Sequence, residues 1–190
     1  MIRRPLIHRS ALPLAALLLS AAPAAASQWA AVPSQSSIGF QSVWNGDTVS
    51  GRFPKFAARI RFDPAKVAEA AVDATIDLAA ATTDNKTANG SLSGDDWFAV
   101  KSGQTARFVT TSISQTKPGS YVARGTLTLR GVNVPVILPF TLAITGDTAV
   151  MSGETRLDRR AFRIGMDSDA SGSWVAFPVP IKIRIVAKRQ

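Results

Sequence analysis

The sequence predicts an all-β protein built as a single antiparallel β-barrel of about eight or more strands. The main observation is a strict alternation of apolar and polar residues, since a strand directs successive side chains to opposite faces. In the last such segment Val179 and Ile183 share one parity, opposite Lys182 and Arg184. The same pattern recurs along most of the chain, which is typical of an antiparallel sheet closed around an apolar interior.

Turn signals separate the alternating segments. Asn45-Gly46-Asp47 predicts a hairpin, because asparagine and glycine accept positive φ angles. Asp63-Pro64 predicts a short helical turn that runs to Ala70. The alternation stops between residues 82 and 102, and this longest interruption predicts a loop with a short helical insertion. The expected strands cover residues 29–32, 36–44, 48–53, 56–62, 71–80, 106–114, 121–130, 132–144, 149–157 and 173–187.

Residues 1–26 are predicted to be a secretory signal peptide. Arg3, Arg4 and Arg9 precede an apolar run, which ends in Pro23 and three alanines. We therefore expect an exported, periplasmic protein whose residues 27–190 form one domain, large enough to bury a sizeable core.

The charge of the chain gives a weak indication of its partners. Removal of the three leader arginines lowers the formal net charge from +9 to +6. The basic residues are scattered singly over the strands, so the sequence predicts no nucleic-acid partner and at most transient membrane contact.

The chain lacks the residues on which much enzyme chemistry depends. It contains no cysteine, and its one histidine, His8, lies in the predicted leader, so thiol catalysis and the usual serine triads and zinc sites are excluded. No metal or redox cofactor is implied, and the protein is predicted not to be an enzyme. The alternative is a carboxylate-based hydrolase that uses aspartates of the irregular segments. These are Asp84, Asp95, Asp96, Asp167 and Asp169.

The apolar parity is the most informative set of residues, and it predicts the lining of the barrel. An eight-stranded barrel is either just filled by its side chains or holds one small ligand. Small residues on this parity, among them Gly51, Ala74 and Gly125, are expected to leave room at the centre. A fully packed barrel that acts as an interaction module in the cell envelope is the other alternative. The predicted lining comprises Ile38, Phe40, Phe53, Phe56, Ile76, Trp97, Phe98, Phe108, Leu127, Leu129, Val136, Leu138, Phe140, Met151, Phe162, Val175, Phe177 and Val179.

Several motifs between about residue 29 and the C-terminus resemble motifs of the YceI-like family and occur in the same order. The longest runs from Gly125 to Val136 and resembles the family pattern G-x-L-T-L-x-G-V-x-x-P-V. Shorter matches are Ser36 to Phe40, Gly51-Arg52-Phe53 with Phe56, Phe62-Asp63-Pro64, Leu92 with Trp97-Phe98, and Arg159 with Phe162 and Ile164. The resemblance implies an exported lipocalin-like barrel that carries or sequesters a long-chain lipid or isoprenoid, with quinone-like ligands in that class. The resemblance is also compatible with a homodimer.

The sequence departs from the family pattern at three places. Residues 88–92 read Ala-Asn-Gly-Ser-Leu where the family often has Arg-Asp-x-His-Leu, and Gln35-Ser36 stands where the family has His-Ser. The glycine that follows the family's Arg-x-x-Phe is Arg163 here. The polar end of the tunnel is therefore predicted to differ, with candidate head-group contacts at Asn85, Asn89, Ser91 and Asp96.

Overall fold

The computed structural model describes residues 27–44 and 46–190. The predicted signal peptide and Asn45 of the predicted hairpin turn lie outside the described residues. None of the helices in the described part of the chain is long and apolar enough to cross a membrane.

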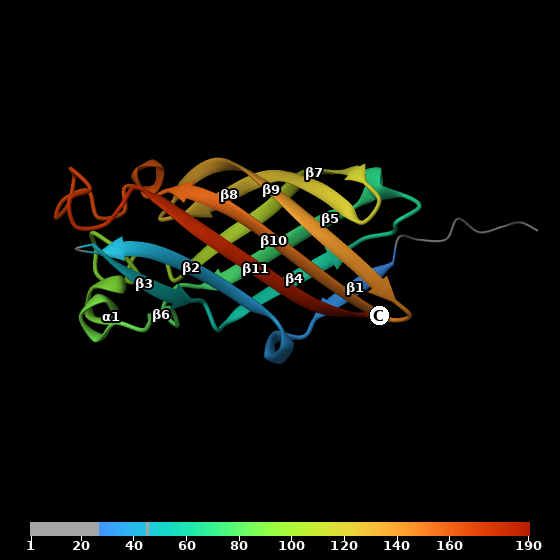
Figure 1. Ribbon diagram of the computed structural model, residues 1–190, viewed down its shortest axis with the longest axis horizontal. Helices are drawn as coiled ribbons and strands as arrows, with labels where there is room; N and C mark the ends of the chain where they lie inside the picture. The colour runs from blue at the N-terminus through green and yellow to red at the C-terminus, as the bar shows by residue number, and fades with distance from the viewer. Residues whose placement is uncertain (1–26, 45) are drawn as a thin grey trace, which may run out of the picture.

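The fold is a closed, eight-stranded antiparallel barrel, as the alternation predicts (Figure 1). Each strand pairs with the next in the barrel order, and β1 closes it by pairing with both β4 and β11. The barrel strands in spatial order are β1 (Gln28–Ala31), β4 (Phe56–Arg61), β5 (Ala71–Asp77), β7 (Thr105–Lys117), β8 (Ser120–Leu129), β9 (Val132–Thr145), β10 (Thr148–Asp158) and β11 (Pro178–Arg189).

Three further strands extend the sheet at one end of the barrel. β2 (Ser37–Trp44) pairs with β11, β3 (Asp47–Arg52) pairs with β2, and the two-residue β6 (Thr82–Thr83) pairs with β3. The predicted insertion forms the short helix α1 (Lys86–Leu92), whose first turn is capped by the Asn85 side chain. Single 3₁₀ turns are η1 (Pro33–Gln35), η2 (Val67–Glu69) and η3 (Arg159–Phe162). Figure 1 shows α1 at the same end of the barrel as the loop that joins β10 to β11.

The strands separate at this end. The β2–β11 ladder ends at Phe40 and Ile181, and Pro180 lies just beyond it on β11. The β9–β10 ladder ends in the same way at Phe140 and Gly153. Proline has no N–H to donate to a neighbouring strand, so it is tolerated where a ladder stops.

The predicted strand over residues 173–187 is wrong at its start. β11 begins at Pro178, and the only pairing of residues 173–177 in the described chain is an isolated bridge between Val175 and Trp44. The reason is that the backbone amides of Trp174 and Val175 donate to the Asp169 carboxylate, which holds this segment in a loop. Alternation predicts the side-chain parity of a strand, but not where its backbone finds other partners.

Candidate binding cavity

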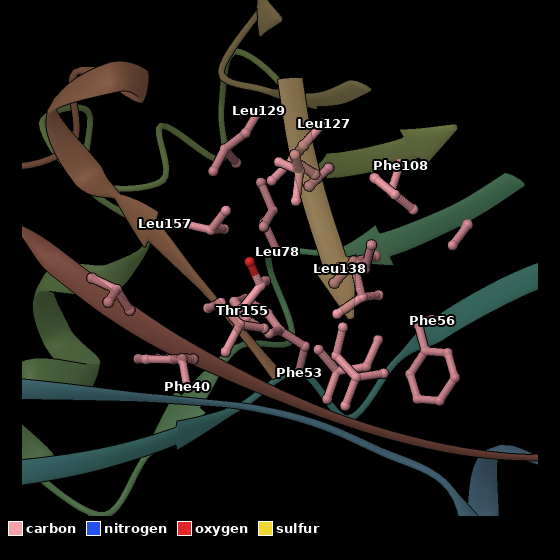
Figure 2. Close-up of a pocket in the computed structure, with 18 of the residues that line it drawn as sticks. Phe40, Phe53, Phe56, Leu78, Phe108, Leu127, Leu129, Leu138, Thr155 and Leu157 are labelled. Carbon is pink, nitrogen blue, oxygen red and sulfur yellow. The ribbon is translucent and has the colours of Figure 1, made fainter. Parts of the chain in front are cut away.

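The barrel encloses a cavity of about 500 Å³, a size typical of small-ligand pockets. Its walls are almost entirely aliphatic and aromatic, and Figure 2 shows side chains from several strands pointing into the same space. Phe56, Phe108 and Leu127 point inward yet are only partly buried, because they border unfilled space. The interior is therefore not the fully packed core that the sequence left as an alternative.

Two apolar clusters contribute to the wall of the cavity. One is built around Trp29 and Phe62, where the Trp29 indole N–H donates to the Phe62 carbonyl over 3.0 Å. The other is built around Phe162 and Phe98 at the end that carries α1. Phe53 packs against both clusters, so it lies midway along the cavity.

The structure places almost all of the predicted lining residues around this cavity, most of them on strands, where their parity is the inward one. They are Ile38, Phe40, Phe53, Phe56, Ile76, Trp97, Phe98, Phe108, Leu127, Leu129, Val136, Leu138, Phe140, Met151, Phe162, Val175 and Val179.

Phe177 is the exception and does not line the cavity. It precedes β11, and its ring lies under the guanidinium groups of Arg159 and Arg160, 5.0 and 4.3 Å from its centroid. The predicted strand began five residues before β11 does, and Phe177 lies in that extension, in the loop.

The glycines on the inward parity leave less room than predicted. A Cβ on Gly51 would lie 2.1 Å from the Phe40 ring, and one on Gly125 would lie 2.8 Å from the Phe108 ring. The space left by each glycine is filled by an aromatic side chain of a neighbouring strand. Alanines such as Ala58 and Ala74, which pair across β4 and β5, do border the cavity.

Two tryptophans near the α1 end were not among the predicted lining residues. Trp44 shares its inward parity on β2 with Phe40, so the alternation contained the signal for it. Trp174 belongs to the β10–β11 loop, is 52% exposed and borders the cavity. Leu92 of α1 also lines this end. Trp174 and Ser91 are exposed and also border the cavity, so this end reaches the surface among β2, α1 and the β10–β11 loop, and we call it the opening.

Three of the four predicted head-group residues serve the local fold and do not line the cavity. The Asn85 side chain caps α1, and the Asn89 amide exchanges hydrogen bonds with Thr83 on β6. The Asp96 carboxylate accepts from the amides of Asp167 and Ser168. Ser91 alone borders the cavity, and it is solvent-exposed. Short polar side chains in turns usually bond to nearby backbone, which explains these positions.

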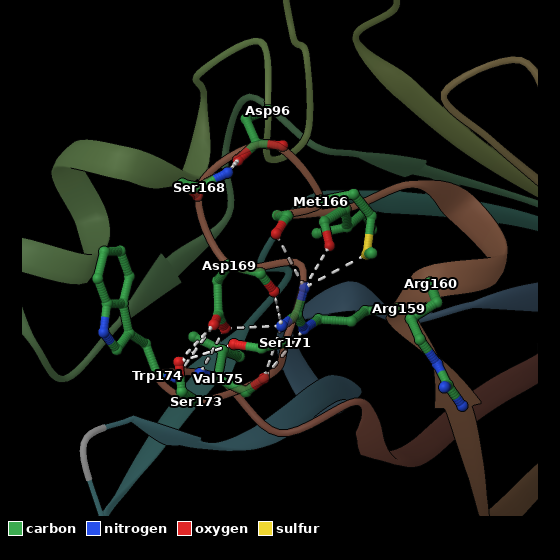
Figure 3. A network of polar contacts seen from close by, with 12 residues as sticks. Asp96, Arg159, Arg160, Met166, Ser168, Asp169, Ser171, Ser173, Trp174 and Val175 are labelled. Carbon is green, nitrogen blue, oxygen red and sulfur yellow. Dashed lines mark hydrogen bonds and ion pairs between the residues drawn. The ribbon is translucent and has the colours of Figure 1, made fainter.

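A buried ion pair organises the loop beside the opening (Figure 3). The Arg159 guanidinium donates to the carbonyls of Val175, Ile164 and Gly165 and to the Asp169 carboxylate. Burial opposes the charged form of Asp169, but the amides of Val175 and Trp174 and the Arg159 charge outweigh it, so the pKa of Asp169 lies below its usual value. Although Arg159 borders the cavity, its donors are engaged by protein acceptors.

Asp96 and Arg130 connect this loop to the segment that follows α1. The Asp96 carboxylate also accepts from the Ser168 hydroxyl over 2.5 Å, and Arg130 donates to the carbonyls of Asp95 and Arg163. Partial burial opposes the charge on Asp96, but the Ser168 and Asp167 hydrogen bonds and the Arg130 charge lower its pKa below the usual value. Both oxygens of Asp96, like both oxygens of Asp169, are therefore used to hold loops.

Comparison with known proteins was made by sequence and by structure. A model of the YceI-like domain matches residues 29–187. A UPF0312 protein of Photorhabdus laumondii is 34% identical over 126 residues, which cover 65% of this chain and 65% of that protein. This chain thus spans 65% of the length of the curated relatives it matches, just under two-thirds.

Solved structures share the fold. BcnA of Burkholderia cenocepacia is 33% identical with a TM-score of 0.79, and the match covers 82% of this chain and 98% of BcnA. A polyisoprenoid-binding domain from Saccharophagus degradans has a TM-score of 0.67 at 13% identity, covering 85% of this chain and 98% of that one, which shows a common fold. Because the domain match spans nearly all of the described barrel, the chain belongs to the YceI-like family.

Proposed function

We propose that this barrel binds a long-chain amphipathic lipid of the polyisoprenoid type and carries or sequesters it in the periplasm. The observation that supports the proposal best is the apolar cavity of about 500 Å³ inside the closed barrel. A long tail gains most from such a space, because each buried methylene contributes about 0.8 kcal/mol. A tail of about ten carbons thus contributes roughly 8 kcal/mol before the costs of association.

One structural neighbour supports the same class of ligand. The Saccharophagus degradans domain with this fold is a polyisoprenoid-binding domain. Quinone-like molecules belong to the same proposed class, because they combine an isoprenoid tail with an uncharged head. The predicted leader at residues 1–26 supports the proposed periplasmic location, and we expect membrane contact to be transient, during lipid transfer.

A binding role accounts for the aspartates better than a hydrolase does. The Asp96 and Asp169 carboxylates each accept at least three hydrogen bonds from the protein, and their pKa values are lowered. A general acid at neutral pH needs a raised pKa, so these two carboxylates are poorly suited to the hydrolase alternative.

Lipid extraction tests the proposal directly. Protein purified from its native host without detergent is extracted with organic solvent, and the extract is analysed by mass spectrometry. We expect a long-chain lipid in near-stoichiometric amount, and the delipidated protein should take up a polyisoprenoid alcohol from vesicles. An empty extract together with no uptake by the delipidated protein would refute the function.

A further inference from the structure

One hydroxyl on the cavity wall has no partner. Among the buried side-chain nitrogen and oxygen atoms of residues 27–44 and 46–190, Ser42 Oγ alone makes no hydrogen bond. Ser42 lines the cavity from β2, where it lies on the same face as Phe40 and Trp44. A buried polar group left without a partner costs about 1–3 kcal/mol, so native structures rarely retain one without a role.

The other hydroxyls that border the cavity show the contrast. Thr110 donates to the Val72 carbonyl, Thr155 donates to the Ile137 carbonyl, and Thr83 donates to the Asn85 carbonyl. The Ser168 hydroxyl donates to Asp96, and Ser91 is exposed to solvent. Ser42 alone among them is both buried and unbonded.

The strands on either side of Ser42 bring no polar side chain to its hydroxyl. The β2–β11 ladder ends at Phe40 and Ile181, so Ser42 lies two residues beyond the last pair. On its other side Ser42 pairs with Val49, whose side chain is apolar and buried. Beyond it Trp44 borders the cavity near the opening, so Ser42 lies just inside this end with apolar wall further in.

The charges around the cavity restrict which ligand head groups could bind beside Ser42. Among the described residues that line it, Arg159 is the one charged side chain, and its guanidinium is bonded to Asp169 and to backbone carbonyls. A phosphate or ammonium group drawn inside would lose its hydration without gaining a counter-ion. Burying an uncharged alcohol or carbonyl oxygen costs much less than burying a charge, and one hydrogen bond offsets much of that cost.

From these observations we infer that Ser42 Oγ is the polar contact for an uncharged, oxygen-bearing head group, an alcohol or a carbonyl, of the bound lipid. The head lies just inside the opening beneath Trp44, and the tail runs past Phe53 toward Phe56 and Phe108. This inference rests on the proposed lipid-binding function and specifies the ligand's head group.

The test compares two probes that differ only at the head. Farnesol and the isoprenoid hydrocarbon farnesene are titrated into delipidated wild-type protein, Ser42→Ala and the control Ser37→Ala, which removes a hydroxyl from the outer face of the same strand. We expect Ser42→Ala to weaken farnesol binding about five- to tenfold and to leave farnesene binding within about twofold. Ser37→Ala should change neither.

Thermal unfolding of the same ligand-free variants separates recognition from structure. Because Ser42 Oγ makes no bond within the protein, Ser42→Ala should leave the Tm unchanged or raise it. An equal loss of affinity for both probes, unchanged farnesol binding, or a lowered Tm would each overturn the role of Ser42. If neither probe binds the wild type, the lipid-binding function itself fails, and the inference fails with it.

Discussion

Arg159 Nη2 lies 2.7 Å from Asp169 Oδ2, and the two side chains are only 2% and 1% exposed. The pair joins η3, at the end of β10, to the loop that leads into β11. An ion pair this deeply buried stabilises a structure only when its remaining hydrogen-bonding groups are also satisfied. Here the surrounding backbone satisfies them, so the pair holds the loop beside the cavity opening in one conformation.

Removing one member of this pair should be costly. Asp169→Asn leaves the Arg159 charge buried without its counter-ion, and we expect the free energy of unfolding to fall by about 3–5 kcal/mol. Asp73→Asn is the control, because it breaks the exposed Asp73–Arg107 pair and should have a much smaller effect. Urea denaturation followed by circular dichroism measures both, and equal losses would contradict the role of burial.

The Asp96 contacts should make stability depend on pH. A carboxyl whose pKa is lowered by folding stabilises the protein above its unfolded pKa of about 4, and this contribution is lost as the pH falls through the folded pKa. We expect Asp96→Asn to cost about 1 kcal/mol near neutral pH, with the difference from wild type shrinking below about pH 4. Asp95→Asn makes the same charge change on the exposed neighbour and should show little effect. If the free energy of unfolding of Asp96→Asn differs from that of wild type by the same amount from pH 7 to about pH 3, this account is contradicted.

Adjacent residues on β9 provide a matched test of the cavity. Leu138 is buried and faces inward, whereas Ile137 is 50% exposed on the outer face. Leu138→Trp should reduce uptake of a polyisoprenoid alcohol about tenfold, because the ring displaces roughly two methylenes of the tail. Ile137→Trp should leave uptake unchanged. Equal uptake by the two variants, measured with retained far-UV circular dichroism, would place the ligand elsewhere.

Arg163 occupies a backbone conformation that favours glycine. Its φ angle is +55°, in the left-handed region, and the family pattern has glycine at this position. Arg163→Gly should therefore raise the free energy of unfolding by about 0.5–1 kcal/mol. Ala161→Gly, at an exposed position of η3, should lower it instead. If Arg163→Gly is less stable than wild type, the arginine side chain itself contributes to the stability of the fold.

The sequence predicted the barrel and its inward face, because the alternation of side chains along a strand is a local property. Leu127 and Leu138 line the cavity since parity alone decides their direction. The prediction was wrong where a segment leaves the strand, at Phe177, and where a turn uses its own polar side chains, at Asn85 and Asn89.

Only the tertiary structure decided how much of the interior is open and where it is polar. The Phe40 ring fills the space beside Gly51, a contact between two strands that the pattern within one strand does not contain. Ser42 resembles any strand serine in the sequence, and only the structure shows that its hydroxyl is unbonded, on a part of β2 beyond the end of the β2–β11 ladder. Cavity volume and unmet hydrogen bonds depend on contacts between distant segments, whereas side-chain parity depends on the strand's own period of two.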